Sequence, residues 1–236
     1  MKYSLWLSSI SPHSFHPQAS SPSPFAHSNI QNGSLAVPQG RDIAPVINTL
    51  LTLPFALKIA TRDWHPPNHI SFADNHPGAV PLQSYHTITH PTDPTKSDTT
   101  LLWPRHCVQG TKGAELVPEL DVVKIDEVLD KGLDPRVEMY SAFWDPMRVS
   151  VSSLGDTLRR NGVTHVFVVG LAADYCVQST AESAAEEGYQ TFIVEEGTRP
   201  VMKDTWEKEG KKKVEAKGVK IVSIDGEEIA RVRRLA

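Results

Sequence analysis

The sequence has few cysteines: only Cys107 and Cys176 occur among 236 residues. Two cysteines do not imply a disulfide framework, so we expect a reducing compartment, in the first place the cytoplasm, with the nucleus or a peroxisome as other options. No apolar run approaches the roughly 18 residues of a membrane-spanning helix, so no membrane is expected as a partner. The net charge of -4 argues against nucleic acid as a partner. The length and composition suit one α/β domain with a sizeable core.

Acidic residues are absent from the start of the chain, where Asp42 is the first carboxylate. Residues 1–31 are rich in serine, proline and histidine and follow neither the helical nor the strand period. Such a segment buries too little apolar surface to offset the entropy of ordering it. We therefore predict that residues 1–31 are disordered or aberrant and that one domain covers residues 32–236. An organelle transit peptide is a weak alternative, because Lys2 is the only lysine or arginine in this segment.

Residues 163–177 carry the clearest strand signal. Residues 166–171 form a nearly unbroken apolar run, and a helix-like pattern follows at once. This combination is typical of a buried strand in a parallel sheet. Further strands are expected at residues 55–61, 122–125, 190–194 and 219–224, and helices at residues 42–53, 153–161 and 203–217. Their alternation predicts an α/β fold with a doubly wound, mostly parallel sheet flanked by helices. Residues 73–100 show no period and are expected to form a long loop.

Cys176 follows the apolar run, at the edge of the sheet where open α/β folds bind their ligands. A cysteine at the start of a helix has its thiolate favoured by the helix dipole, which suits a nucleophile. The alternative is a small buried residue that packs against the sheet. Lys131 has a similar pair of interpretations: a solvated lysine, or an ammonium that keeps a neighbouring thiolate and carboxylate charged.

Asp63 and His65 stand two residues apart at the end of an expected strand, so their side chains leave the same face. His106, from a later loop, could complete a site with three protein ligands. Nitrogen and oxygen ligands of this kind suit Zn²⁺, and Mn²⁺ or Fe²⁺ would also fit. The spacing alone is a weak signal, because most such pairs are solvated loop residues. His69 could be an outer neighbour of the same site.

Four blocks of residues occur in an order that carries a resemblance. They are Asp63-Trp64-His65-Pro66 with His69, Ser71 and Phe72; Trp103-Pro104 with His106-Cys107-Val108, Gly110-Thr111 and Gly113-Ala114-Glu115; Lys131-Gly132 with Tyr140-Ser141-Ala142-Phe143; and Gly170-Leu171-Ala172 with Asp174-Tyr175-Cys176-Val177. Together they resemble the nicotinamidases of the isochorismatase-like cysteine hydrolase family, from about Gly33 to the C-terminus. Four blocks in order are far more specific than any one of them.

The resemblance implies an amidohydrolase that converts nicotinamide to nicotinate and ammonia in NAD salvage. Cys176 would be the nucleophile and would form a thioester as ammonia leaves. Backbone N–H groups of Ala172 and Cys176 would form the oxyanion hole, with a cis peptide at Leu171–Ala172. Lys131 would be the cationic member of the catalytic triad.

The resemblance also assigns the remaining parts of the site. Asp63, His65 and His106 would bind a divalent metal, most simply Zn²⁺, which would anchor the pyridine nitrogen of the substrate. Trp103 and Tyr140 would wall the aromatic pocket, where a flat ring finds stacking partners. Self-association into a homo-oligomer is a further expectation, by analogy with the family only.

One part of the family pattern is missing. Its members begin with a hydrophobic strand that ends in an aspartate, about ten residues before the Gly-Ser-Leu that starts here at Gly33. Counting back from there reaches the neighbourhood of Ser23, where the sequence has no aspartate and no strand-like run. We therefore expect the general base and the first central strand of the sheet to be absent. Loss of a general base typically costs ~10²–10⁴ in rate.

Two explanations are open for this gap. The N-terminus could be an artefact or variant, such as a wrongly chosen first exon, or the chain could be a real one that is catalytically dead or crippled. We favour the first, because all the other site residues are present. The alternative function is a dead relative that binds a metal and a small aromatic ligand, or a partner protein. A third is hydrolysis of another small amide, such as pyrazinamide or a ureido acid.

Overall fold

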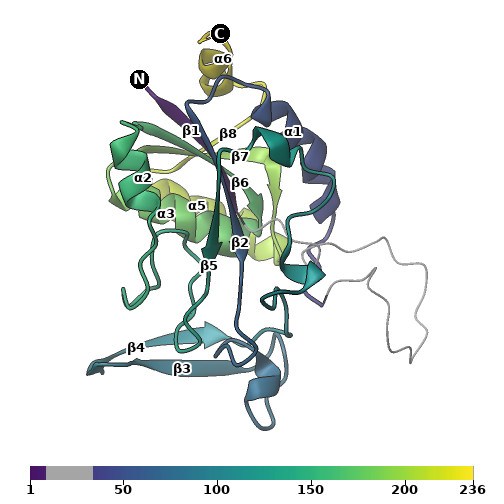
Figure 1. The fold of residues 1–236 in the computed structure, drawn as a ribbon, viewed down its shortest axis with the longest axis vertical. Coiled ribbons are helices and arrows are strands. Elements are labelled where there is room, and N and C mark those ends of the chain that lie inside the picture. Colours follow the sequence, from purple (N-terminus) through teal and green to yellow (C-terminus); the bar gives the residue numbers. More distant parts are fainter. Residues whose placement is uncertain (9–33, 236) are drawn as a thin grey trace, which may run out of the picture.

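The computed structural model describes residues 1–8 and 34–235. Its centre is a six-stranded sheet in the order β5-β2-β1-β6-β7-β8, in which every neighbouring pair is parallel (Figure 1). The strands are β1 (Tyr3–Ser8), β2 (Leu57–Asp63), β5 (Glu127–Lys131), β6 (His165–Leu171), β7 (Gln190–Arg199) and β8 (Lys220–Val222). The predicted α/β fold with a doubly wound parallel sheet is confirmed.

Helices cover both faces of the sheet. They are α1 (Ala44–Leu51), α2 (Leu154–Arg160), α3 (Gln178–Glu186), α4 (Lys203–Thr205), α5 (Lys211–Ala216) and α6 (Glu227–Arg233). One apolar cluster joins the sheet to α1 and α6, and a second joins the opposite face to α2, α3 and α5. The strand β6 is buried along its whole length, as its unbroken apolar run predicts. Among the described residues, none of the helices has the length and apolar composition of a membrane span.

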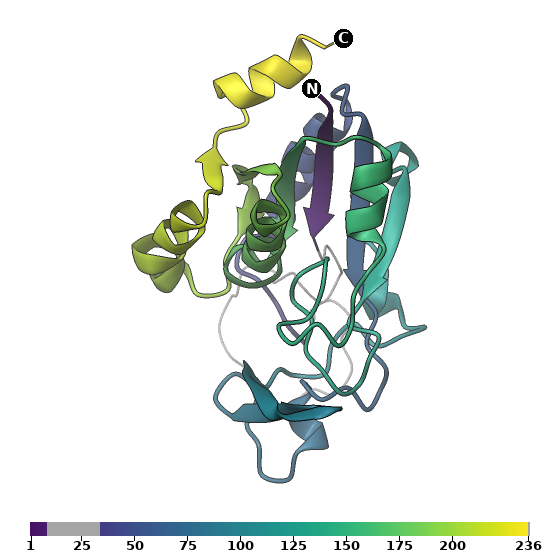
Figure 2. The ribbon, with the colours of Figure 1, turned by 90° about the vertical axis from the view of Figure 1, so that its left-hand side faces the viewer.

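The first strand corrects the prediction for the N-terminus. Residues 3–8 form β1, which lies between β2 and β6 in the middle of the sheet (Figure 2). The expected absence of a first central strand is therefore wrong. The composition of residues 1–31 as a whole concealed a short strand at their start, where Tyr3 and Leu5 are buried in the core. Residues 9–33 lie outside the described residues, so disorder there stays a prediction.

Two local predictions also need correction. Most of residues 73–100, expected as a loop, belong to an antiparallel hairpin of β3 (Tyr85–His90) and β4 (Asp93–Leu101), set apart from the main sheet (Figure 1). Most side chains of this hairpin are exposed or half-buried, so its sequence lacks the alternation of apolar and polar residues that indicates a strand. Residues 122–125 do not form a strand: residues 122–124 form a short 3-10 helix in which Val123 is 87% exposed, and only Ile125 packs against the core. The strand follows immediately, as β5.

Candidate active site

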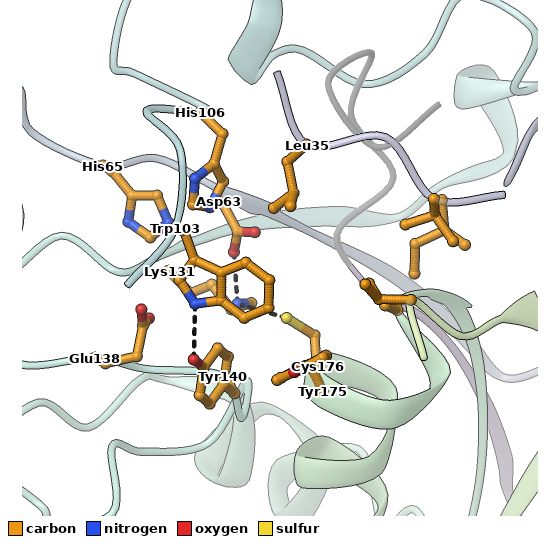
Figure 3. Close-up of a pocket in the computed structure, with 14 residues that line it drawn as sticks. Leu35, Asp63, His65, Trp103, His106, Lys131, Glu138, Tyr140, Tyr175 and Cys176 are labelled. Atoms are coloured by element: carbon orange, nitrogen blue, oxygen red, sulfur yellow. Dashed lines mark hydrogen bonds and ion pairs between the residues drawn. The ribbon is translucent and has the colours of Figure 1, made fainter. Parts of the chain in front are cut away.

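The carboxyl ends of β2, β5 and β6 meet at one edge of the sheet and bring the chemically interesting residues around one pocket (Figure 3). All the residues to which the resemblance assigns a role line it: Asp63, His65, Trp103, His106, Lys131, Tyr140, Ala172 and Cys176. Six further residues line it, none of which the sequence assigned to the pocket: Leu35, Val37, Glu138, Leu171, Tyr175 and Val201. Segments far apart in the sequence therefore contribute to a single cavity.

Asp63, His65 and His106 form a compact buried cluster. Their candidate ligand atoms all lie within 4.8 Å of one another. Asp63 ends β2, and the N–H group of His65 donates to the carbonyl of Cys107 at 2.9 Å, which joins the two loops that carry the imidazoles. This pairing explains how His106 reaches Asp63 across a long sequence separation.

Backbone carbonyls orient both imidazoles of the cluster. The Nδ1 atom of His65 lies 3.0 Å from the carbonyl oxygen of Gly132, and the Nδ1 atom of His106 lies 2.7 Å from that of Pro104. A ring that donates through Nδ1 keeps Nε2 as the acceptor, which is the form that binds a metal. Burial lowers the pKa of both histidines, so both are neutral near pH 7. The donor set, its tautomers and its charge state fit a divalent cation.

His69 lies against this cluster. Its ring centroid is 4.1 Å from that of His65, and its Nδ1 atom is 2.8 Å from the hydroxyl oxygen of Ser71. In the described part of the chain its buried Nε2 atom has no hydrogen-bond partner. A buried imidazole nitrogen of this kind is satisfied by an ordered water or by a cation nearby.

Lys131, the last residue of β5, connects the cluster to the thiol. Its side chain is only 3% exposed, and its Nζ atom contacts Asp63 Oδ1 at 2.5 Å, the Met139 carbonyl oxygen at 3.0 Å and Cys176 Sγ at 3.4 Å. These three contacts use the three donors of an ammonium group. Burial opposes its charge, but Asp63 and Cys176 outweigh burial and raise the pKa of Lys131. Burial alone would raise the pKa of Asp63, but Lys131 together with His65 and His106 outweighs it, so the pKa of that carboxyl is lowered.

Cys176 lies in η6 (Ala173–Val177), the turn that leads from β6 into α3. The peptide bond between Leu171 and Ala172 is cis, as expected from the resemblance. The Ala172 carbonyl accepts N–H groups from Tyr175 and Val177 at 3.1 Å, which closes the turn around the cysteine. The thiol is therefore held at the pocket by backbone geometry as well as by Lys131.

Three aromatic rings form one wall of the pocket. The Trp103 ring centroid is 4.7 Å from that of Tyr175, which is 5.5 Å from that of Tyr140. The indole N–H of Trp103 donates to the hydroxyl of Tyr140 at 2.8 Å, and Thr100 of β4 lies 2.9 Å from the same hydroxyl. Tyr175 is not predicted as part of the pocket from the sequence, although its position next to Cys176 in the chain indicates it. The wall suits a flat, aromatic ligand.

A further carboxyl group, that of Glu138, lines the pocket and is 4% exposed. Burial raises the pKa of Glu138, although the positive charge of Lys131 partly opposes this effect. The sequence offered no periodic or motif signal for this residue. No aspartate or glutamate comes from β1, which ends at Ser8 beside Gly170 of β6. The position that counting back gives for the end of this strand, near Ser23, is therefore wrong; Ser23 itself lies outside the described residues.

The comparisons with known proteins agree with this geometry. Residues 29–225 match the Isochorismatase domain, which covers most of the chain. The chain belongs to the isochorismatase family. A nicotinamidase from Acinetobacter baylyi is 41% identical over 162 residues, which span 69% of this chain and 72% of the relative. The prediction of a nicotinamidase-like hydrolase acting on amide bonds is confirmed.

Solved structures from the same family share the fold. The yeast nicotinamidase bound to the inhibitor nicotinaldehyde superposes with a TM-score of 0.81 at 32% identity and covers 94% of this chain and 99% of its own. A pyrazinamidase from Pyrococcus horikoshii in complex with zinc has a TM-score of 0.68 at 29% identity, with 94% and 99% covered. The family match starts at residue 29, so β1 occupies its place in the sheet from outside the matched range.

Proposed function

We propose that this chain hydrolyses nicotinamide to nicotinate and ammonia and that the reaction serves NAD salvage. The observation that carries the proposal is the buried chain of contacts from Cys176 through Lys131 to Asp63, beside two neutral imidazoles and an aromatic wall. A thiol, a cation that stabilises its anion and a flat slot are the parts that covalent hydrolysis of an aromatic amide requires. The kinship with nicotinamidases supports the same substrate.

In the proposed mechanism, the sulfur of Cys176 attacks the carboxamide carbon and forms a tetrahedral intermediate. The N–H groups of Ala172 and Cys176 would stabilise its oxyanion, a contribution that is typically worth ~2.7–4 kcal/mol per donor. The C–N bond then breaks, ammonia leaves with the proton lost by the thiol, and a thioester remains. Water hydrolyses the thioester, which yields nicotinate and restores the thiol.

Asp63, His65 and His106 would hold a divalent cation, for which Zn²⁺ is the first choice and Mn²⁺ or Fe²⁺ are alternatives. The bound cation would supply a Lewis-acid anchor for the pyridine nitrogen. The zinc complex of the Pyrococcus pyrazinamidase supports this assignment. Trp103 and Tyr140 would hold the ring flat, and Lys131 would keep the sulfur anionic during attack.

A second candidate function is favoured by one specific observation: β1 ends without a carboxylate. A relative without its general base could bind the metal and a small aromatic ligand, or a partner protein, without turnover. The two candidates differ in one assay, because only an enzyme releases ammonia from nicotinamide.

The test uses the purified chain with Zn²⁺ and nicotinamide, and it follows ammonia. Release that exceeds the rate of Cys176→Ala supports the enzyme, and pyrazinamide in parallel reports on the width of the specificity. Absence of release, together with saturable Zn²⁺-dependent binding of nicotinamide by calorimetry, would favour the binding function. Neither release nor binding would refute both.

A further inference from the structure

Asp63 belongs to two groups of residues at once. It is one of the three candidate metal ligands, and its Oδ1 atom lies 2.5 Å from Nζ of Lys131. Within residues 1–8 and 34–235, it is the one carboxylate that forms an ion pair with Lys131. The same Nζ atom contacts the sulfur of Cys176 at 3.4 Å (Figure 3). The metal cluster and the thiol are therefore separated by a single ammonium group.

We propose that Asp63 couples metal occupancy to the reactivity of Cys176, because Lys131 and a bound cation share the charge of one carboxylate. This inference rests on the proposed metal site and extends the proposed function. When no cation is bound, Asp63 neutralises Lys131, and the lysine offers little net charge to the sulfur. A bound cation draws on the same carboxylate, so more of the positive charge of Lys131 is directed at Cys176 and the thiolate is favoured.

The coupling has a physical basis in burial. Asp63 and Lys131 have side chains only 12% and 3% exposed, so solvent screens their charges weakly. Lys131 and a bound cation are both positive and share the carboxylate of Asp63, so Lys131 should weaken metal binding, and its removal should strengthen it. Couplings of this kind typically change an affinity about 5-fold to 150-fold.

The first experiment measures metal affinity by competition with a chromophoric chelator. All variants carry Cys176→Ala, so that the thiol cannot bind Zn²⁺ itself. We expect Lys131→Met to bind Zn²⁺ about 10-fold or more tightly than the parent, and Lys131→Arg, which keeps the charge, to stay within about 3-fold. Lys124→Met is the matched control: that lysine is exposed and pairs with Asp121, so its loss should change nothing. Unchanged or weaker affinity in a folded Lys131→Met protein would overturn the proposal.

The second experiment keeps Lys131 and so does not depend on the folding of that variant. The rate of alkylation of Cys176 by iodoacetamide is measured at pH 7 with Mn²⁺ and with a chelator, in a Cys107→Ala background. Mn²⁺ is used because it prefers oxygen and nitrogen ligands to sulfur. We expect alkylation to be about 5-fold or more faster with saturating Mn²⁺, and we expect no acceleration in Asp63→Asn.

An equal or slower rate with bound Mn²⁺ would overturn the coupling. Neither measurement involves nicotinamide. An inactive chain that shows the coupling would thus refute the proposed reaction alone, and an active chain without the coupling would refute this inference alone.

Discussion

Substitution of Ser8 by aspartate tests whether the site lacks only a proton acceptor. Lys131 ends β5 and Cys176 follows β6, yet their Nζ and Sγ atoms are 3.4 Å apart. In the order β5-β2-β1-β6, the strands β2 and β1 lie between them. The contact therefore spans the carboxyl end of β1, where Ser8 pairs with Gly170. Adjacent strands are about 4.8 Å apart, so we expect a carboxylate introduced at this end to reach both partners.

The register of the sheet also selects position 8. Faces alternate along a strand, so positions 4 and 8 of β1 share one face. Ser4 pairs with Leu57 of β2, and Leu57 is an even number of residues from Asp63, which in turn pairs with Lys131. The register therefore predicts that a carboxylate introduced at position 8 is on the same face as Asp63 and Lys131.

The expected gain follows from the chemistry of proton transfer. A positioned general base contributes ~10²–10⁴ in rate, which corresponds to about 3–5 kcal/mol of activation free energy. We expect Ser8→Asp to raise kcat/KM for ammonia release by about that factor, with an acidic limb in the pH profile that the parent lacks.

Three controls accompany this variant. Ser8→Asn keeps the shape without the charge, Ser97→Asp adds the charge on exposed β4, and Ser8→Asp with Cys176→Ala removes the nucleophile; none should show the gain. If a folded, metal-loaded Ser8→Asp protein is no more active than Ser8→Asn, the assignment of position 8 is refuted.

Three further predictions concern single residues of the site. Cys176→Ala should reduce ammonia release to background, whereas Cys107→Ala should retain it, and a colorimetric ammonia assay distinguishes the two. Lys131→Met removes the ammonium group from the buried ion pair with Asp63, so the free energy of unfolding in urea should fall by ~3–5 kcal/mol, and a loss below ~1 kcal/mol would contradict the buried ion pair. Burial lowers the pKa of His69 from 6.5 to about 4, so its contribution to stability is present above pH 6.5 and is lost as the pH falls toward 4. Between pH 7 and pH 5, the free energy of unfolding of the metal-free protein should therefore fall by about 2 kcal/mol more than that of a His69→Asn variant. Equal losses in the two proteins would contradict the assignment.

The sequence predicts what depends on burial and on motifs. The strand β6 can be predicted because it is wholly buried and its central residues are apolar, and the residues that line the pocket can be predicted because four blocks occur in order. The hairpin β3–β4 escapes prediction because backbone pairing holds it together with few buried side chains. Glu138 escapes for a different reason: its burial results from tertiary packing around Lys131, which no local pattern records.

The strand β1 shows that the fold and the proposed chemistry place different requirements on the same residues. A central strand needs little more than a backbone that completes two ladders and a few buried side chains, and Tyr3 and Leu5 provide these. The fit is imperfect, since the hydroxyl of Ser4 is buried without a hydrogen-bond partner in the described part of the chain. An unpaired hydroxyl costs about 1–3 kcal/mol, which a sheet held by five other strands can absorb. The proposed reaction has no such tolerance, because its general base would have to stand at one particular position. The sheet can therefore form with a strand from outside the family match, while the proposed turnover would depend on the residue at its end.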